Sequence, residues 1–63
     1  MKKVRANQTV MKTGTTITYI VLGKVYELYT EFITEKMFSG TCYVVLAEDR
    51  HIHGLDSDYF DEI

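Results

Sequence analysis

Glycine is the residue that most constrains the fold of this chain. The sequence has four glycines and no proline, so the glycines mark the positions where the chain can turn. Gly14, Gly23, Gly40 and Gly54 divide the chain into segments of strand length. These segments are rich in Val, Ile, Thr, Tyr and Phe, the side chains that fit a pleated surface. The pattern therefore predicts an all-β protein.

The small size of the chain limits the kind of core that it can form. Its 63 residues make one domain, residues 1–63, near the lower limit for folding without a metal or disulfides. Cys42 is the only cysteine, which excludes an intramolecular disulfide and a cysteine-based metal cluster. No apolar run is long enough for a signal peptide or a membrane span. We expect a cytoplasmic protein with no cofactor.

Charge is unevenly distributed along the chain. Residues 1–24 hold five basic side chains and no acid, whereas residues 25–63 hold nine acids against two basic side chains. The first expected strand, residues 2–6, places Val4 and Ala6 on one face and basic side chains on the other. We expect this basic strand to lie beside an acidic last strand, although separate binding patches of opposite sign are the alternative.

A polar loop follows through Gly14, and the second strand is expected to start at residue 17. Ile17, Tyr19 and Val21 alternate there and are predicted to share one face. Gly23 and Lys24 then mark a tight turn.

Beyond the turn, the alternation predicts a half-buried strand. Its buried face would contain Tyr26, Leu28 and Phe32, with Glu27, Tyr29 and Glu31 on the other. A helix within residues 24–37 is the alternative, because apolar residues also recur there at helical spacing. Stacked glutamates and many β-branched or aromatic residues favour the strand, with a helical turn still open near TEKMF.

The segment TCYVVLAE is apolar on both faces, as expected for a strand in the interior of a sheet. EDRH predicts a hairpin turn around Asp49 and Arg50. HIHGL predicts a partner strand that Gly54 ends, with Ile52 facing away from His51, His53 and Leu55.

The end of the chain, DSDYFDEI, predicts one turn of 3₁₀ helix and a brief last strand. Phe60 is expected in the core and Tyr59 on the surface. Asp56, Asp58, Asp61 and Glu62 are interpreted as solvent-facing partners of the basic first strand, because their spacing lacks the pattern of a calcium loop.

The expected elements follow the order of a small SH3-like barrel. This order has five strands, with a long loop after the first, a hairpin between the third and fourth, and a single turn before the fifth. TYIVLGKVYELY resembles the diverging-turn segment of SH3 domains, and GLDSDYFDEI is similar to their closing turn and strand. LGKVYELY with YVVLAEDRHIHGLDSDYFDEI resembles small SH3-like proteins of bacteriophages and Gram-positive bacteria, mostly without assigned function. The resemblance covers most of residues 17–63.

The resemblance implies a partly open barrel with a binding role and no chemistry of its own. Tyr59 matches the tyrosine of the Ser-x-Tyr element in the SH3 peptide groove. The chain departs from the pattern elsewhere: it has no Ala-Leu-Tyr-Asp-Tyr motif, no Trp where Thr41, Cys42 and Tyr43 stand, and Asp56 in place of the groove proline. These departures argue against a polyproline ligand.

Two arrangements of reactive side chains are present in the sequence. His51 and His53 share a strand face, but zinc requires three or four ligands, so we interpret the pair as solvent-facing and expect no metal. Cys42 with a histidine and Asp49 resembles a thiol-protease set, yet an apolar strand favours an inert, packed thiol. We therefore expect no enzymatic activity.

A protein-binding module is the function that the sequence favours, in a phage or phage-derived accessory protein that acts on a host or defence protein. The expected binding residues are Tyr29, Tyr59, Tyr43, Asp56 and Asp58, with Tyr29 and Tyr59 as anchors, because five tyrosines exceed what so small a core can enclose. One alternative is a homo-oligomeric structural or assembly protein that pairs through a strand edge.

Nucleic-acid binding is a second and weaker alternative, opposed by an isoelectric point near 5.5. It would use a basic and aromatic strip made of Lys2, Lys3, Arg5, Lys12, Lys24 and Tyr19.

Overall fold

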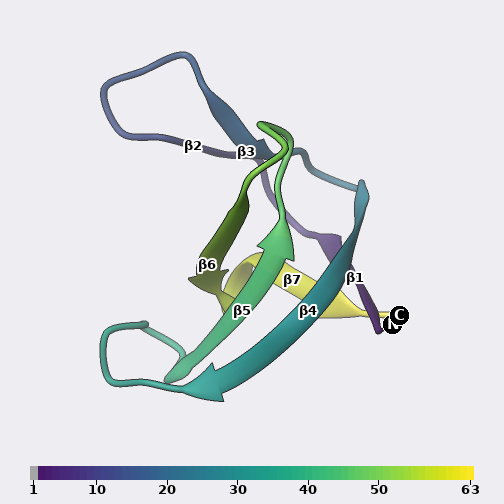
Figure 1. Ribbon diagram of the computed structural model, residues 1–63, viewed down its shortest axis with the longest axis vertical. Coiled ribbons are helices and arrows are strands. Elements are labelled where there is room, and N and C mark those ends of the chain that lie inside the picture. Colours follow the sequence, from purple (N-terminus) through teal and green to yellow (C-terminus); the bar gives the residue numbers. More distant parts are fainter. Residues whose placement is uncertain (1) are drawn as a thin grey trace.

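The computed structural model describes residues 2–63 and consists mainly of β-strands (Figure 1). In chain order the elements are β1 (Lys3–Ala6), β2 (Val10–Met11), β3 (Thr18–Ile20), β4 (Val25–Ile33), β5 (Thr41–Leu46), β6 (Ile52–Asp56), the 3₁₀ turn η1 (Ser57–Tyr59) and β7 (Phe60–Glu62). The all-β prediction is confirmed. The helical alternative for residues 24–37 is wrong, because β4 occupies most of that segment and pairs on both sides.

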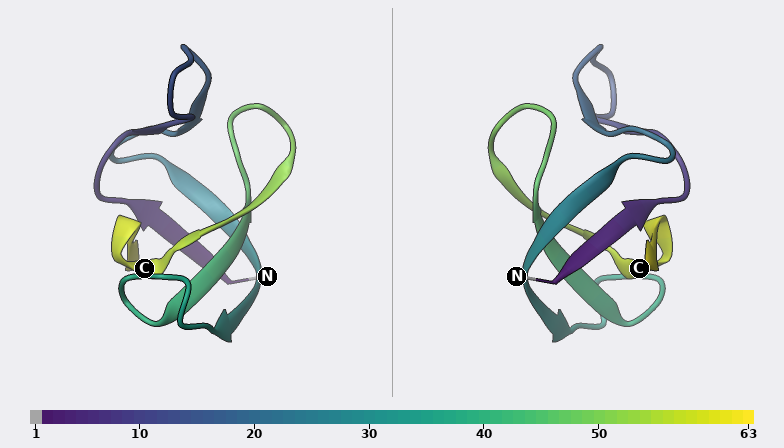
Figure 2. Two further views of the ribbon diagram at one scale, coloured as in Figure 1. Left: turned by 90° about the vertical axis from the view of Figure 1, so that its left-hand side faces the viewer. Right: turned by 90° about the vertical axis from the view of Figure 1, so that its right-hand side faces the viewer.

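The strands form a five-stranded antiparallel sheet in the order β6-β5-β4-β1-β7 and a separate arm in which β2 pairs with β3. Figure 2 shows this arm projecting beyond the sheet. The expected five strands become seven for two reasons: the polar segment after β1 contributes β2, and the segment that begins at residue 17 divides at Gly23 into β3 and β4. The end strands β6 and β7 are not hydrogen-bonded to each other, so the sheet does not close into a barrel.

The first and last strands lie side by side, as the charge distribution predicted. β1 pairs with β7 in a register that places Arg5 opposite Asp61. Lys2 Nζ lies 2.7 Å from Glu62 Oε1 in an exposed salt bridge. Exposed pairs of this kind contribute about 0–1 kcal/mol, so the strand pairing rests chiefly on its backbone ladder and on the side chains that it buries.

A single core lies inside the curved sheet. It consists of Val4, Ala6, Ile20, Tyr26, Leu28, Val45 and Phe60. The predicted core positions of Phe60, of Val4 and Ala6 in the first strand, and of Tyr26 and Leu28 therefore match the structure. Ile20 of the three-residue β3 also lies in the core, whereas Ile17 and Val21, which were predicted to alternate with it, are exposed.

A β-bulge in β4 changes which face of the sheet the side chains in the second half of that strand point toward. Leu28 pairs with Val45 and Thr30 with Val44, so Tyr29 is an extra residue in the ladder. Side chains after the bulge change faces. Phe32, which was predicted to lie with Tyr26 and Leu28, is instead 52% exposed on the opposite side.

The predicted turns are present. Lys24 N donates to Val21 O at 3.0 Å around Gly23, whose φ of +84° favours glycine. Ala47 N donates to His51 O at 3.0 Å, which closes the predicted β5–β6 hairpin.

Gly54 was predicted to end a strand, and this is wrong because it lies in the middle of β6. A Cβ at this position would lie 2.7 Å from Cys42 Sγ. The space beside Gly54 is therefore already filled by the neighbouring thiol.

Candidate functional site

The residues predicted to bind a partner differ in their exposure. Tyr29 is 43% exposed at the bulge of β4, and Asp58 is exposed on η1. Tyr43 and Tyr59 are half-buried and pack against the core. The Tyr43 ring centroid lies 5.9 Å from that of Phe60. Two of the five predicted residues therefore support the core.

Asp56 has a structural role, because it is buried and bonded to two backbone groups. Its Oδ1 accepts from Asp58 N at 3.0 Å and thereby caps η1. Its Oδ2 accepts from Ser39 N at 3.2 Å in the turn between β4 and β5. The bonds from Asp58 and Ser39 lower the pKa of Asp56 below its ordinary 3.8. The carboxylate thus fastens two loops together.

The end of β4 and the turn that follows it display the two most exposed apolar side chains among residues 2–63. Ile33 is 89% exposed and Phe38 is 97% exposed. We call these two residues the hairpin end. An aromatic side chain in free contact with water forgoes the stabilisation that burial of its surface would give.

Hydrogen bonds of neighbouring residues constrain the backbone of the turn that carries Phe38. Thr34 N donates to Gly40 O at 2.9 Å across the turn. Ser39, the next residue after Phe38, bonds through its hydroxyl to Ser57 Oγ at 2.8 Å and to Thr41 O at 3.1 Å. Together with the Asp56 bond, these contacts fix the turn against η1.

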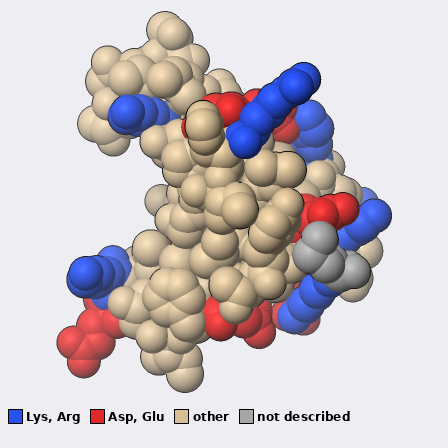
Figure 3. Space-filling model, viewed as in Figure 1, with Lys and Arg blue, Asp and Glu red and all other residues tan. Residues whose placement is uncertain are grey.

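The outer face of β4, β5 and β6 is largely apolar, and much of it is exposed, although Cys42 and Asp56 on the same face are buried. Tyr43 and Val45 point into the core, so the alternate residues of β5 and their cross-strand partners point outward. The exposed or half-buried apolar residues of this face are Val25, Phe32, Val44, Leu46 and Ile52, which we call the outer patch. Figure 3 shows this face with uncharged side chains at its centre and charged ones around its margin.

A hollow of about 460 Å³ adjoins the outer patch, where β4 and β5 separate. Their ladder stops at Leu28 and Val45, and Val25–Glu27 pair only with β1. Its lining residues are Lys24, Val25, Tyr26, Glu27, Leu46, Ala47, Glu48 and Arg50.

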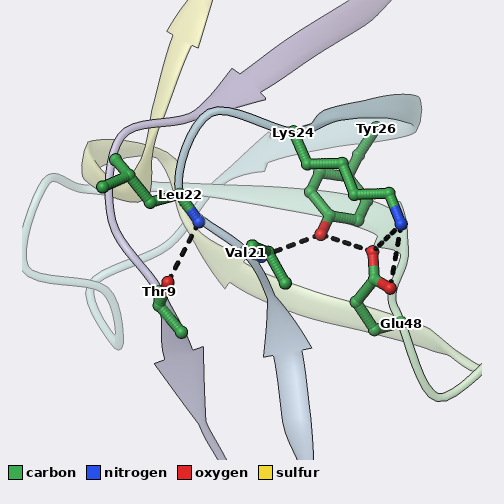
Figure 4. Close-up of polar contacts among 6 residues, drawn as sticks. All are labelled: Thr9, Val21, Leu22, Lys24, Tyr26 and Glu48. Atoms are coloured by element: carbon green, nitrogen blue, oxygen red, sulfur yellow. Dashed lines mark hydrogen bonds and ion pairs between the residues drawn. The ribbon is translucent and has the colours of Figure 1, made fainter.

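Polar contacts brace the hollow (Figure 4). Tyr26 OH donates to Glu48 Oε2 at 2.7 Å and accepts from Val21 N at 2.8 Å. Lys24 Nζ lies 2.7 Å from the same carboxylate. Burial and the Glu48 bond raise the pKa of Tyr26 to about 12. Bonds from Lys24 and Tyr26 lower the pKa of Glu48. The β3–β4 turn is thereby tied to the end of β5.

The histidines and the cysteine do not converge on a reaction centre. His53 Nε2 lies 2.7 Å from Asp49 Oδ2, and its ring packs on Tyr19 at 4.3 Å between centroids. Cys42 lies on the face of the sheet that His53 does not share. Its cross-strand partner is Asp56, and its side chain is buried. Burial raises the pKa of its thiol. Within residues 2–63, no group of three potential metal ligands comes together.

Two of the basic residues of the first 24 positions are neutralised by acidic partners. Lys2 and Lys24 are paired with Glu62 and Glu48. Tyr19, their proposed aromatic companion, packs against the core and stacks on His53.

Sequence reasoning missed the hairpin end. Phe38 carries a usable signal, because it stands in a polar turn directly before Ser39 and Gly40, where a buried aromatic is unexpected. Ile33 carries none, since an isoleucine at the end of a strand is ordinary. Its exposure follows from the length of β4.

No protein-family model, curated protein or solved structure matches the chain. Within residues 2–63, no helix has the length and apolar character needed to cross a membrane.

Proposed function

We propose that this chain is a non-catalytic protein-interaction module whose anchor is the hairpin end. The observation that carries the proposal is the 97% exposure of Phe38 on a turn that hydrogen bonds hold in place. Binding hot spots are aromatic or large apolar groups that become fully desolvated in a partner.

The fixed turn supports the proposal energetically. Ordering a loop on binding costs free energy, and a loop that is already ordered avoids that cost. Ser39 and Asp56 provide this order directly behind Phe38. Asp56 therefore contributes to binding in this proposal as a positioning residue, whereas Tyr29, at the bulge, is a candidate for direct contact at the margin.

We further propose that the domain belongs to the SH3-like class. The support is the order of its elements: an arm after β1, a hairpin between β5 and β6, and a 3₁₀ turn before β7. The half-buried Tyr59 does not offer the free aromatic groove that a polyproline peptide needs. The sequence resemblance extends the proposal to a phage-derived accessory protein that acts on a host or defence protein.

Site-specific photo-crosslinking tests the role of the hairpin end. A photo-reactive phenylalanine derivative replaces Phe38 in one sample and Ile63 in the control, since Ile63 is also exposed but lies beyond β7. After irradiation in an extract of the producing cell, we expect a discrete adduct from position 38 and none from position 63. The adduct should weaken when Ile33→Ser is added.

Equal labelling from both positions, or no adduct from position 38, would contradict the proposal. The mass of the adduct also distinguishes a foreign partner from a second copy, which would give twice the 7.3 kDa of one chain.

A further inference from the structure

The hollow between β4 and β5 is bordered by the backbone of β4 as well as by side chains. β4 pairs with β5 only from Leu28 onward, so among residues 2–63 no strand pairs with Val25 on the β5 side. Ala6 N donates to Lys24 O at 2.9 Å, so this carbonyl points toward β1. Because neighbouring residues of a strand direct their backbone groups to opposite sides, the N–H and C=O of Val25 point away from β1 and toward the hollow.

The facing part of β5 is arranged in the same way. Ala47 N donates to His51 O at 3.0 Å, so Ala47 directs its backbone to the β6 side. Leu46 therefore directs its backbone toward β4, and it lines the hollow together with Val25. Both side chains are exposed. The hollow of about 460 Å³ thus combines strand edges with apolar surface, the combination that binds an extended peptide by strand addition.

One of the charges that line the hollow remains for a ligand. Lys24 Nζ lies 2.7 Å from the Glu48 carboxylate, so these two charges offset each other. Glu27 lies directly opposite Lys3 in the register of β1 and β4. Arg50 belongs to none of the three salt bridges within residues 2–63. Because a guanidinium group binds a carboxylate through paired N–H donors, Arg50 favours an acidic ligand.

The position of Arg50 also gives the ligand a direction. β4 begins at Val25 at one end of the hollow, and the turn that follows β5 carries Arg50 at the same end. A peptide antiparallel to β4 would therefore run with its carboxyl end toward Arg50, and antiparallel pairing is the slightly more stable kind. The wall is already ordered, because Tyr26 OH joins Val21 N to Glu48 (Figure 4). An ordered site avoids part of the cost of binding.

We propose that the hollow binds an extended acidic peptide. The peptide pairs antiparallel with the free edge at Val25, packs an apolar side chain against Val25 and Leu46, and places a carboxylate on Arg50. This site goes beyond the proposed function, because it lies where β4 begins, whereas the hairpin end lies where β4 finishes and beyond. The two surfaces can therefore be tested separately.

An NMR titration of the isotope-labelled full chain tests the site. The probe is the blocked peptide acetyl-Thr-Val-Thr-Val-Asp-amide, whose single carboxylate stands at its carboxyl end. We expect saturable shifts centred on the amide signals of Val25 and Leu46, and slower hydrogen exchange at the Val25 amide. Peptides with Asn or Lys in place of the Asp should bind about two- to five-fold more weakly, the effect of one exposed ion pair.

A charge reversal tests the role of Arg50. Arg50→Glu should reverse the preference, so that the Lys peptide binds more tightly than the Asp peptide. Lys12→Glu is the matched control, since Lys12 is exposed just beyond β2 and should leave the wild-type preference in place. Phe38→Ser should bind the Asp peptide like the wild type. Dispersed amide signals in each variant show that it remains folded.

The outcomes separate this inference from the proposed function. An Asp peptide that gives no saturable shift at Val25 and Leu46, or equal affinities of the three peptides for the wild type, overturns the peptide site. An unreversed preference in a folded Arg50→Glu variant overturns it as well. Peptide binding without a crosslink from position 38 retains this site and contradicts the role of the hairpin end.

Discussion

At the scale of single residues, Tyr26 joins the core to the polar surface. Its ring packs in the core, where its centroid lies 6.4 Å from that of Phe60 in an edge-on arrangement. Its hydroxyl meanwhile connects Val21 N to Glu48 (Figure 4). Removing the hydroxyl therefore leaves the packing in place and deprives two polar groups of their partner.

The raised pKa of Tyr26 predicts a loss of stability in alkaline solution. The pKa rises from 10.0 to about 12 on folding, so the folded state holds the proton more tightly than the unfolded state. Below pH 10 this contribution is fully present, and it disappears as pH rises from 10 through 12. Urea unfolding of the wild type and Tyr26→Phe should show that the variant loses less stability across this window. Parallel curves for the two proteins would contradict the prediction.

At neutral pH, Tyr26→Phe should cost about 1–2 kcal/mol of unfolding free energy, because Val21 N and Glu48 each lose a bond in a half-buried position. The same urea curves give this value at pH 7.

At the scale of elements, the β4–β5 turn and η1 stabilise each other through Asp56. Asp56→Ala should lower the unfolding free energy by about 1–2 kcal/mol, the usual cost of losing a capping carboxylate. It should also accelerate hydrogen exchange at the amides of Ser39 and Asp58, which donate to it.

Asp58→Ala is the control, since this side chain is exposed and should change stability by less than about 0.5 kcal/mol. Because the pKa of Asp56 is lowered on folding, its contribution is present above pH 3.8 and is lost as pH falls through the lowered value. Unchanged exchange at Ser39 in Asp56→Ala would show that the turn is held by other contacts.

Most elements could be predicted from local patterns, and each error has a physical cause. Val4 and Ala6 alternate with exposed basic residues in a regular strand. Because successive side chains of a strand point to opposite faces, their burial could be predicted from the sequence. Phe32 was placed on the wrong face because the extra residue Tyr29 is visible only when β4 is set against β5. The β2–β3 arm was missed because a two-residue strand has too few positions to show a period.

At the scale of the whole molecule, the fold depends on contact between the two ends of the chain. β7 pairs with β1, and Phe60 is the only β7 residue in the core cluster. Deleting residues 60–63 should therefore abolish the cooperative thermal transition seen by circular dichroism, because loss of a buried Phe alone costs about 3–5 kcal/mol in a domain of marginal stability.

Deleting only Ile63, which is 69% exposed, should leave a cooperative transition close to that of the wild type. A cooperative transition in the longer deletion would show that the other four strands of the sheet are sufficient for folding.

The sequence alone determined the all-β class, the strand segments, the β5–β6 hairpin, the 3₁₀ turn and the meeting of basic and acidic termini. These features depend on the alternation of apolar and polar side chains, on the residues that favour turns and on the distribution of charge. All three are local or additive properties of the sequence. Only the tertiary structure decided that Asp56 fastens two loops, that Phe38 stands exposed on them, and that β4 and β5 separate into a hollow. These features depend on register across strands distant in sequence, and register is a property of the assembled sheet.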